Sequence, residues 1–130
     1  MQKAAQVTHV LLRIVAGFLF MQHGGQKWLG WYGGMGAQPI PPLMHVAGGL
    51  ELIGGLLILF GLFTRPVAFL LSGEMAVAYF MAHFPNGLLP LANHGEPTAL
   101  YAFVFLFLAA NGAGGFSVDD LIRGRRTPKA

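Results

Sequence analysis

Long apolar stretches alternate with short segments rich in Gly, Pro and charged residues along the chain. A helix that crosses the hydrocarbon core of a bilayer needs about 20 residues, mostly apolar. The pattern predicts helices near residues 7–23, 43–63, 67–84 and 97–111. The predicted fold class is therefore all-α: a polytopic membrane protein that forms a four-transmembrane-helix bundle. The bundle is expected to be a single domain over residues 1–130, with a basic cytoplasmic tail over 116–130.

Composition supports a membrane protein over a soluble helical domain with a large core. Hydrophobic residues make up 55% of the 130 residues and charged residues 10%, and the mean hydropathy is +0.59. Soluble domains carry about 25% charged residues. The chain has no cysteine, which excludes disulfides, thiol redox chemistry and cysteine-bound iron–sulfur clusters within it.

Basic residues are distributed unevenly between the two ends of the predicted helices. One end carries Lys3, Arg65, Arg123, Arg125, Arg126 and Lys129. The other carries only Lys27. The positive-inside rule then places both termini in the cytoplasm, with the protein in the inner membrane of a bacterial-type cell. The net charge of +3 therefore serves topology and contact with the lipid bilayer, and nucleic acid is not expected as a partner.

The second predicted helix has a narrow face with one acid in it. Glu51 is flanked at helical spacing by small residues: Ala47, Gly48, Gly54 and Gly55. The opposite face is Leu, Ile and Phe. Small residues let helices pack closely, and an ionisable residue inside a membrane is a functional hypothesis by default. Glu51 is therefore predicted to face inward.

The first predicted helix has a similar stripe. Steps of three or four residues place Arg13, Gly17, Phe20, Gly24 and Lys27 on one face. An arginine and two glycines in one stripe indicate a face turned to protein or water rather than to lipid.

Depth in the bilayer suggests which charges meet. At about 1.5 Å per residue, Arg13 lies about 9 Å and Glu74 about 12 Å from the cytoplasmic side, whereas Glu51 lies nearer the middle. Arg13 with Glu74 is the favoured pair and Arg13 with Glu51 the second choice. Such a pair can be purely structural. The carboxyl group left without a cation is expected to hold a proton and to donate or relay it, so Glu51, Glu74 and Arg13 are the catalytic candidates.

A second polar group gathers toward the outer side. His83 follows Glu74 by nine residues, which places the two on opposite sides of a regular helix. They can share a site only if the helix breaks. Histidine spacing matches no known metal signature, so no metal site is predicted. A polar mouth for a small lipophilic ligand such as a quinone fits better. The ligand-binding candidates are His23, Lys27, Tyr79, His83, His94, Glu96 and Asn111.

The segment from Gly24 to Pro42 is rich in aromatic, Gly and Pro residues, among them Trp28, Trp31 and Tyr32. It is expected to form a loop or short interfacial helix over one mouth of the bundle. Interfacial anchoring is favoured over contact with a substrate.

Three motifs resemble the DoxX family of small four-helix membrane proteins: LLRIVAGFLFMQHGGQK at 11–27, GGLELIGGLLILFGLFTRPVA at 48–68 and NGAGGFSVDDLI at 111–122. The family motif residues correspond here to Arg13, His23, Lys27, Glu51, Gly112, Gly114 and Asp119. The resemblance implies no established catalytic role for any of them. Some members resemble subunits of a thiosulfate:quinone oxidoreductase, and others are linked to oxidative stress or to quinone and catechol resistance.

Three functions stay open at this point. The first is a quinone-associated subunit of a membrane oxidoreductase, with quinone as cofactor. The second is a transporter or proton-coupled carrier for a small solute. The third is a structural subunit that docks to a larger complex. Other membrane subunits or further copies of the chain are the expected protein partners, and whether the chain itself is catalytic is left open.

Overall fold

The computed structural model describes residues 3–31 and 42–124. Within these ranges the protein contains helices and no strand. The main helices are α1 (Lys3–Leu29), α2 (Pro42–Phe60), α3 (Thr64–Ala78) and α5 (Glu96–Asn111). Shorter elements are the π-helix η2 (Tyr79–His83), the 3₁₀ turn η3 (Phe84–Asn86), α4 (Pro90–Asn93) and α6 (Val118–Gly124).

In the part of the chain that the structure describes, three helical segments are long and apolar enough to cross a membrane: Lys3–Leu29, Pro42–Phe60 and Thr64–Asn86. The last of these continues α3 through η2 and η3. The fourth helix, α5, is apolar but shorter, with 16 residues. Helix α1 extends well past the predicted end near residue 23, because Gly24 and Gly25 are buried within it rather than ending it.

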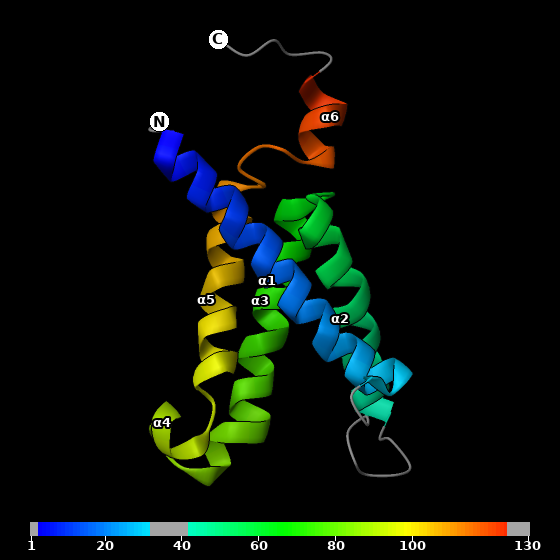
Figure 1. The fold of residues 1–130 in the computed structure, drawn as a ribbon. Helices are drawn as coiled ribbons and strands as arrows, with labels where there is room; N and C mark the ends of the chain where they lie inside the picture. Colours follow the sequence, from blue (N-terminus) through cyan, green and yellow to red (C-terminus); the bar gives the residue numbers. More distant parts are fainter. Residues whose placement is uncertain (1–2, 32–41, 125–130) are drawn as a thin grey trace.

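The bundle consists of two antiparallel helix pairs, α1 with α2 and α3 with α5 (Figure 1). The start of α1, the α2–α3 turn and α6 lie at one end, drawn at the top, which we call the terminal end. The other end, with α4 and the end of α1, is called the loop end. The two pairs diverge toward the loop end.

Glycine brings α1 and α2 together, as the small-residue stripes predict. A Cβ atom at Gly17 would lie 2.5 Å from the backbone nitrogen of Leu59, and one at Gly55 would lie 2.6 Å from that of Met21. Such distances mean that the two backbones are in contact at these positions. The inward faces predicted for both helices are confirmed, since Arg13, Gly17 and Glu51 are all buried.

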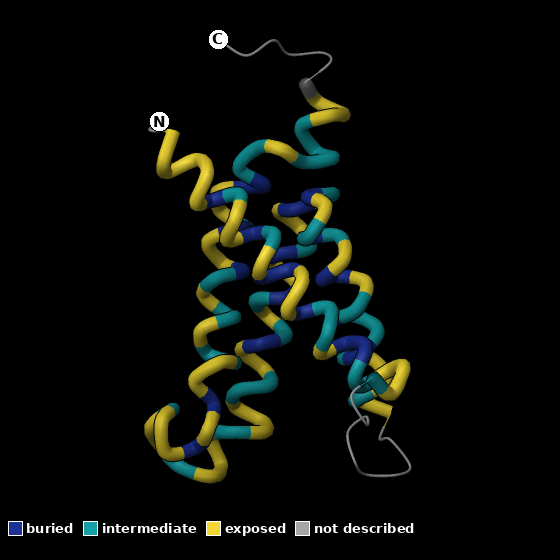
Figure 2. Tube along the Cα trace, viewed as in Figure 1, coloured by how far each residue is buried: buried dark blue, intermediate teal, exposed yellow. Residues whose placement is uncertain are grey.

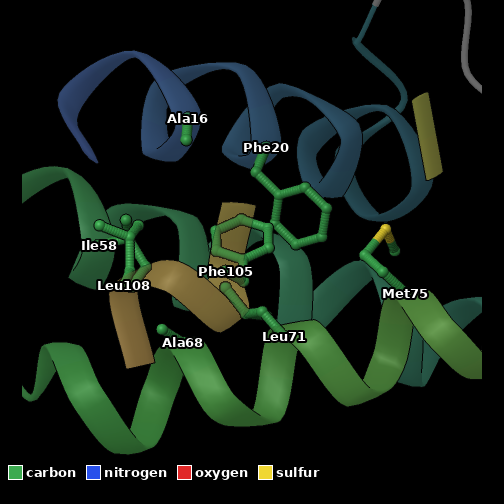
Figure 3. Close-up of a cluster of buried hydrophobic side chains, with 8 residues drawn as sticks. All are labelled: Ala16, Phe20, Ile58, Ala68, Leu71, Met75, Phe105 and Leu108. Carbon is green, nitrogen blue, oxygen red and sulfur yellow. The ribbon is translucent and has the colours of Figure 1, made fainter. Parts of the chain in front are cut away.

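The apolar core is small and lies where the two pairs meet (Figure 3). Phe20 of α1 points into it and meets Phe105 of α5 edge to face, with the ring centroids 4.8 Å apart. The other members are Ala16, Ile58, Ala68, Leu71, Met75 and Leu108. The outward faces are exposed along all four long helices (Figure 2) and carry large apolar side chains such as Phe69 and Phe103. Exposed apolar residues of this kind suit contact with lipid.

The turn between α2 and α3 lies earlier than the sequence predicts. The predicted helices at 43–63 and 67–84 leave residues 64–66 for the turn, which is wrong, because α3 already begins at Thr64. The chain turns instead at Gly61 and Phe63, which adopt left-handed backbone conformations with φ of 72° and 52°. Gly112 is the C-cap of α5, with φ of 77°.

Asp119 stabilises the start of α3 from a distant part of the chain. Its carboxylate oxygens accept hydrogen bonds from the backbone nitrogens of Phe63 (2.8 Å) and Thr64 (2.9 Å). Its own backbone nitrogen donates to the carbonyl of Gly61 at 2.9 Å. A carboxylate at a helix start satisfies free N–H groups and complements the helix dipole.

We expect Asp119→Ala to lower the free energy of unfolding by about 1–2 kcal/mol, the usual cost of losing a helix cap. Asp120→Ala is the comparison, since among the described residues the Asp120 carboxylate accepts one hydrogen bond, at 3.4 Å from the exposed Arg123, and because it caps no helix and its charge acts on Arg13 only without direct contact, we expect a smaller loss than for Asp119→Ala. Denaturant titration in detergent micelles measures both. Equal effects of the two substitutions would contradict the capping role.

Part of the predicted chain lies outside the described residues. This holds for most of the expected interfacial loop, including Tyr32, and for the end of the basic tail after Gly124. Within the described part, Trp28 is half exposed at the end of α1.

Candidate functional site

A cavity of about 440 Å³ lies between the two helix pairs, toward the loop end. We call it the interhelical cavity. All four long helices contribute to its lining, through Lys27 of α1, Glu51 of α2, Glu74 of α3 and Tyr101 of α5. The remaining lining is mostly apolar, with three methionines. Pockets that bind small molecules have volumes of about 300–1,000 Å³ and combine apolar walls with a few polar groups, so this cavity is the candidate site.

An ion pair forms one wall of the cavity. Lys27 Nζ lies 2.7 Å from Glu51 Oε1, and the side chains are only 14% and 3% exposed. Close packing of the helices creates this contact: a Cβ atom at Gly48 would lie 2.9 Å from Cβ of Lys27. Gly48 precedes Glu51 by almost one helical turn, so the α1–α2 crossing places the ammonium group beside the carboxylate.

Glu74 joins this pair from α3. Its side chain lines the same cavity, near the carboxylate of Glu51, and two carboxyl groups that share a largely apolar site do not both ionise readily, so one of them is expected to carry a proton. With Lys27 the three side chains then hold one positive and one negative charge, so the cluster is neutral. One oxygen of Glu74, Oε1, is buried and has no hydrogen-bond partner among the described residues.

Aromatic rings line the α1–α5 side of the cavity. The ring of His23 meets that of Tyr101 edge to face with centroids 6.1 Å apart, and Tyr101 also contacts Phe20 at 5.2 Å. His23 is exposed at the mouth, whereas Phe20 is buried. A flat ligand inserted here would find aromatic side chains at one side and the charged cluster at the other.

His83 lines the same cavity as Glu74, although a regular helix would separate them. The five residues Tyr79–His83 form a π-helix, which has more residues per turn and so rotates His83 relative to the preceding helix. Its Nδ1 donates to the carbonyl of Asn93 at 3.2 Å, and Nε2 lies 3.3 Å from Thr98 Oγ1. The break in the regular helix that a shared site requires is therefore present. The two contacts of His83 connect η2 to α4 and α5.

Arg13 lies apart from the cavity, at the terminal end. Both predicted ion pairs of Arg13, with Glu74 and with Glu51, are wrong. Its guanidinium donates instead to the carbonyls of Ala113 (2.8 Å), Gly115 (2.8 Å) and Phe116 (3.0 Å). The side chain is 1% exposed. We call this set of carbonyls the arginine cradle. Through it, Arg13 connects α1 to the segment after α5.

Four further candidates lie outside the cavity lining: Tyr79, His94, Glu96 and Asn111. The hydroxyl of Tyr79 accepts a 3.0 Å bond from Asn93 Nδ2, and Asn111 Nδ2 donates to the carbonyl of Phe107 at 2.9 Å. His94 and Glu96 are exposed near the loop end. Over the part of the chain that the structure describes, no three His, Asp or Glu side chains converge in a way that could hold a metal ion.

Sequence reasoning missed two kinds of contributor. Tyr101 and Thr98 line the cavity from α5, where they resemble ordinary residues of an apolar helix. The sequence did contain a signal for the Lys27–Glu51 pair. Glycines lie seven residues apart on both helices, at 17 and 24 and at 48 and 55, and this spacing indicates a long, close helix crossing. Lys27 and Glu51 each follow one of these glycines by three residues.

Comparison with known proteins identifies the family of the chain. The DoxX family model matches residues 8–84, which include most of α1, all of α2 and the cavity-lining part of α3. An uncharacterized protein of Haemophilus influenzae is 44% identical, covering 84% of this chain and 86% of its own. "Inner membrane protein YqjF" of Escherichia coli is 34% identical (94% and 97% covered), and "Putative oxidoreductase CatD" of Bacillus subtilis is 29% identical (94% and 92%).

No solved structure matches the chain with significance. The family match extends over more than half of the sequence, and the relatives align over most of it. Together with three helices able to cross a membrane, these similarities show that the chain is a membrane protein that belongs to the DoxX family.

Proposed function

We propose that the protein is an inner-membrane, quinone-binding subunit of an oxidoreductase, and that the interhelical cavity holds the quinone ring. The observation that carries the proposal is the neutral cluster of Lys27, Glu51 and Glu74 beside an apolar, aromatic-walled cavity. A neutral cluster suits an uncharged ligand, because an ion entering from water would have to lose its hydration without gaining an opposite charge. The names of the Escherichia coli and Bacillus subtilis relatives support the compartment and the redox assignment.

The orientation that we propose has four membrane crossings with both termini in the cytoplasm. Lys3, Arg65 and Arg123 belong to elements at the terminal end, and Lys27 lies near the loop end (Figure 1). The positive-inside rule then favours a cytoplasmic terminal end. Helix α5 rises about 24 Å, less than the hydrocarbon core of about 30 Å, and its crossing would be completed by the apolar residues of α4.

In this proposal each lining group has a separate task. Lys27 donates a hydrogen bond to a ring oxygen of the ligand. Glu51 holds Lys27 in place, and the proton shared by Glu51 and Glu74 is available for exchange with the ligand. His23 at the mouth connects the cluster with the outside. The lipid tail would leave between the diverging helix pairs, where the lining is apolar.

Filling the cavity should abolish binding. Ala47→Phe places a ring where Ala47 lines the cavity, and we expect it to weaken binding of a decyl-benzoquinone at least about tenfold. Val46→Phe is the matched control, because Val46 is the adjacent residue, is 67% exposed and lies outside the lining. Calorimetric titration of protein in lipid nanodiscs measures both. A wild-type protein that binds neither decyl-benzoquinone nor its reduced form, decyl-hydroquinone, would refute the proposal.

A further inference from the structure

A second cavity, of about 350 Å³, lies at the terminal end, where α3 begins, α5 ends and α6 follows (Figure 1). We call it the terminal cavity. We propose that it binds the headgroup of an ethanolamine phospholipid, which carries a negative phosphate group and a positive ammonium group. The terminal cavity shares no lining residue with the interhelical cavity, so this proposal does not depend on quinone binding.

Charges of both signs line the terminal cavity. Arg65 and Arg123 contribute two guanidinium groups, and Asp119 and Asp120 contribute two carboxylates. An anion would meet both carboxylates, and a cation would meet both guanidinium groups. A headgroup with one charge of each sign can place each of them beside an opposite charge, so the lining favours a zwitterion.

Arg65 is the group that we assign to the phosphate. Its Nη1 donates to the carbonyls of Ala109 and Ala110 at the end of α5, which holds the guanidinium in place. Its Nε and Nη2 make no hydrogen bond to any described residue, and each lies 3.3 Å from the position of a Cβ atom at Gly112, which also lines the cavity. Two neighbouring N–H groups of a guanidinium match two oxygens of a phosphate.

The wall of the terminal cavity also contains an unsatisfied hydroxyl group. Thr64 lines the cavity and is 1% exposed, and its Oγ1 has no hydrogen-bond partner among the described residues. Its backbone nitrogen is occupied, because it donates to Asp119 Oδ2 at 2.9 Å. A buried hydroxyl without a partner is costly, and a phosphate oxygen beside Arg65 would accept its hydrogen bond.

Asp120 is the group that we assign to the ammonium. Asp119 is committed elsewhere, because both of its carboxylate oxygens accept from backbone nitrogens at the start of α3. Asp120 Oδ1 accepts one hydrogen bond, at 3.4 Å from the largely exposed Arg123. Its Oδ2 accepts none from the described residues and lies 3.6 Å from the position of a Cβ atom at Gly115, in the cavity wall. An ammonium group with N–H donors can bind there.

The surroundings of the terminal cavity fit a lipid better than a soluble molecule. The helical segment that begins at Thr64 is long and apolar enough to cross a membrane, so its first turn lies where the hydrocarbon core meets the headgroups. Pro66 lines the cavity, and Phe69 and Leu70 follow it by three and four residues on the same helix face. These two side chains are 66% and 58% exposed. The acyl chains of a lipid held by its headgroup would therefore run along them.

The test compares two phospholipids that share the phosphate and differ in the amine. The ammonium of phosphatidylethanolamine has three N–H donors, and methyl groups replace all three hydrogens in phosphatidylcholine. Each lipid, with identical acyl chains, is titrated into the full chain in detergent, and native mass spectrometry counts the bound lipid. We expect phosphatidylethanolamine to bind about tenfold more tightly, which corresponds to one hydrogen bond to a charged group.

Two substitutions separate the roles of the two charges. Asp120→Ala removes the partner of the ammonium, so the preference for phosphatidylethanolamine should fall below about twofold. Arg65→Gln should weaken both lipids about tenfold and leave their ratio unchanged, because both carry the same phosphate. Lys3→Gln and Glu96→Ala are the matched controls. Both remove an exposed charge outside the terminal cavity and should preserve the affinities of the wild type.

Two outcomes would overturn the ammonium site: equal binding of the two lipids by the wild-type protein, and an unchanged ratio in a folded Asp120→Ala protein. Soluble phosphoethanolamine carries the same two charges without acyl chains, and we expect that it does not displace the lipid at equal concentration. Displacement at equal concentration would overturn the assignment to a lipid. Because the wild-type comparison needs no variant, a substitution that fails to fold does not remove the test.

Discussion

Replacing Gly17 with alanine is expected to push α1 away from α2 and to lower the free energy of unfolding by roughly 3 kcal/mol, at the upper end for an overpacked site. The added methyl carbon would lie 2.5 Å from the backbone nitrogen of Leu59 and 2.8 Å from the carbonyl oxygen of Gly55. Both neighbours are backbone atoms of α2. They cannot move away by changing a rotamer, so the whole helix must shift.

The loss should extend to the site. Lys27 reaches Glu51 only because α1 and α2 cross closely, with Gly24 and Gly48 at the contact nearest the pair. Separating the helices lengthens this ion pair and widens the cavity wall. Gly17→Ala should therefore weaken quinone binding as well as stability, although Gly17 does not line the cavity.

Gly73→Ala provides the control for this substitution. A Cβ atom at Gly73 meets nothing within 4 Å, and the residue lies inside α3, where alanine is favoured over glycine by about 1 kcal/mol. Unfolding in mixed micelles with increasing denaturing detergent measures both variants. If Gly17→Ala were as stable as the wild type or as Gly73→Ala, the close α1–α2 crossing would be disproved.

Arg13→Leu is expected to cost about 3–5 kcal/mol, the range for removing one partner of a buried charged contact. The guanidinium satisfies the carbonyls of Ala113, Gly115 and Phe116. Leucine fills similar space but donates nothing, and each buried acceptor left unpaired costs about 1–3 kcal/mol. The segment after α5 should detach, which also removes Asp119 from the start of α3.

Two further variants test the geometry of the arginine cradle. Arg13→Lys keeps the charge but cannot span three carbonyls with a planar fork, so it should recover only part of the lost stability. Arg123→Leu removes a charge that is 61% exposed and that, among the described residues, is paired with Asp120 alone, and it should have little effect. Protease cleavage after α5, monitored by mass spectrometry, reports detachment. An Arg13→Leu protein that resists cleavage as well as the wild type would show that Arg13 does not hold the segment after α5 in place.

Arg13 also explains why depth alone predicted the wrong pairs. The sequence prediction compared charged residues by their position along the bilayer normal, and by that measure Glu74 and Glu51 are the acids nearest to Arg13. Backbone carbonyls do not appear in such a ranking. Yet the segment Gly112–Phe116 turns back through residues with positive φ, so its carbonyls are free of helical bonds and point at the guanidinium.

The sequence by itself determined the helices, their inward faces and the presence of acids within the bundle. Each of these depends on one helix at a time: on the thickness of the bilayer, on hydrophobicity and on the period of 3.6 residues. Gly17 and Glu51 could therefore be assigned to buried faces from their spacing alone.

Only the tertiary structure decided which groups meet. Lys27 reaches Glu51 because two glycine-lined helices pack closely, and Glu74 lies near Glu51 because α3 packs against α2. His83 lines the cavity only because a π-turn rotates it. These contacts depend on the relative placement of helices that are distant in sequence, and small changes in crossing or register exchange one partner for another.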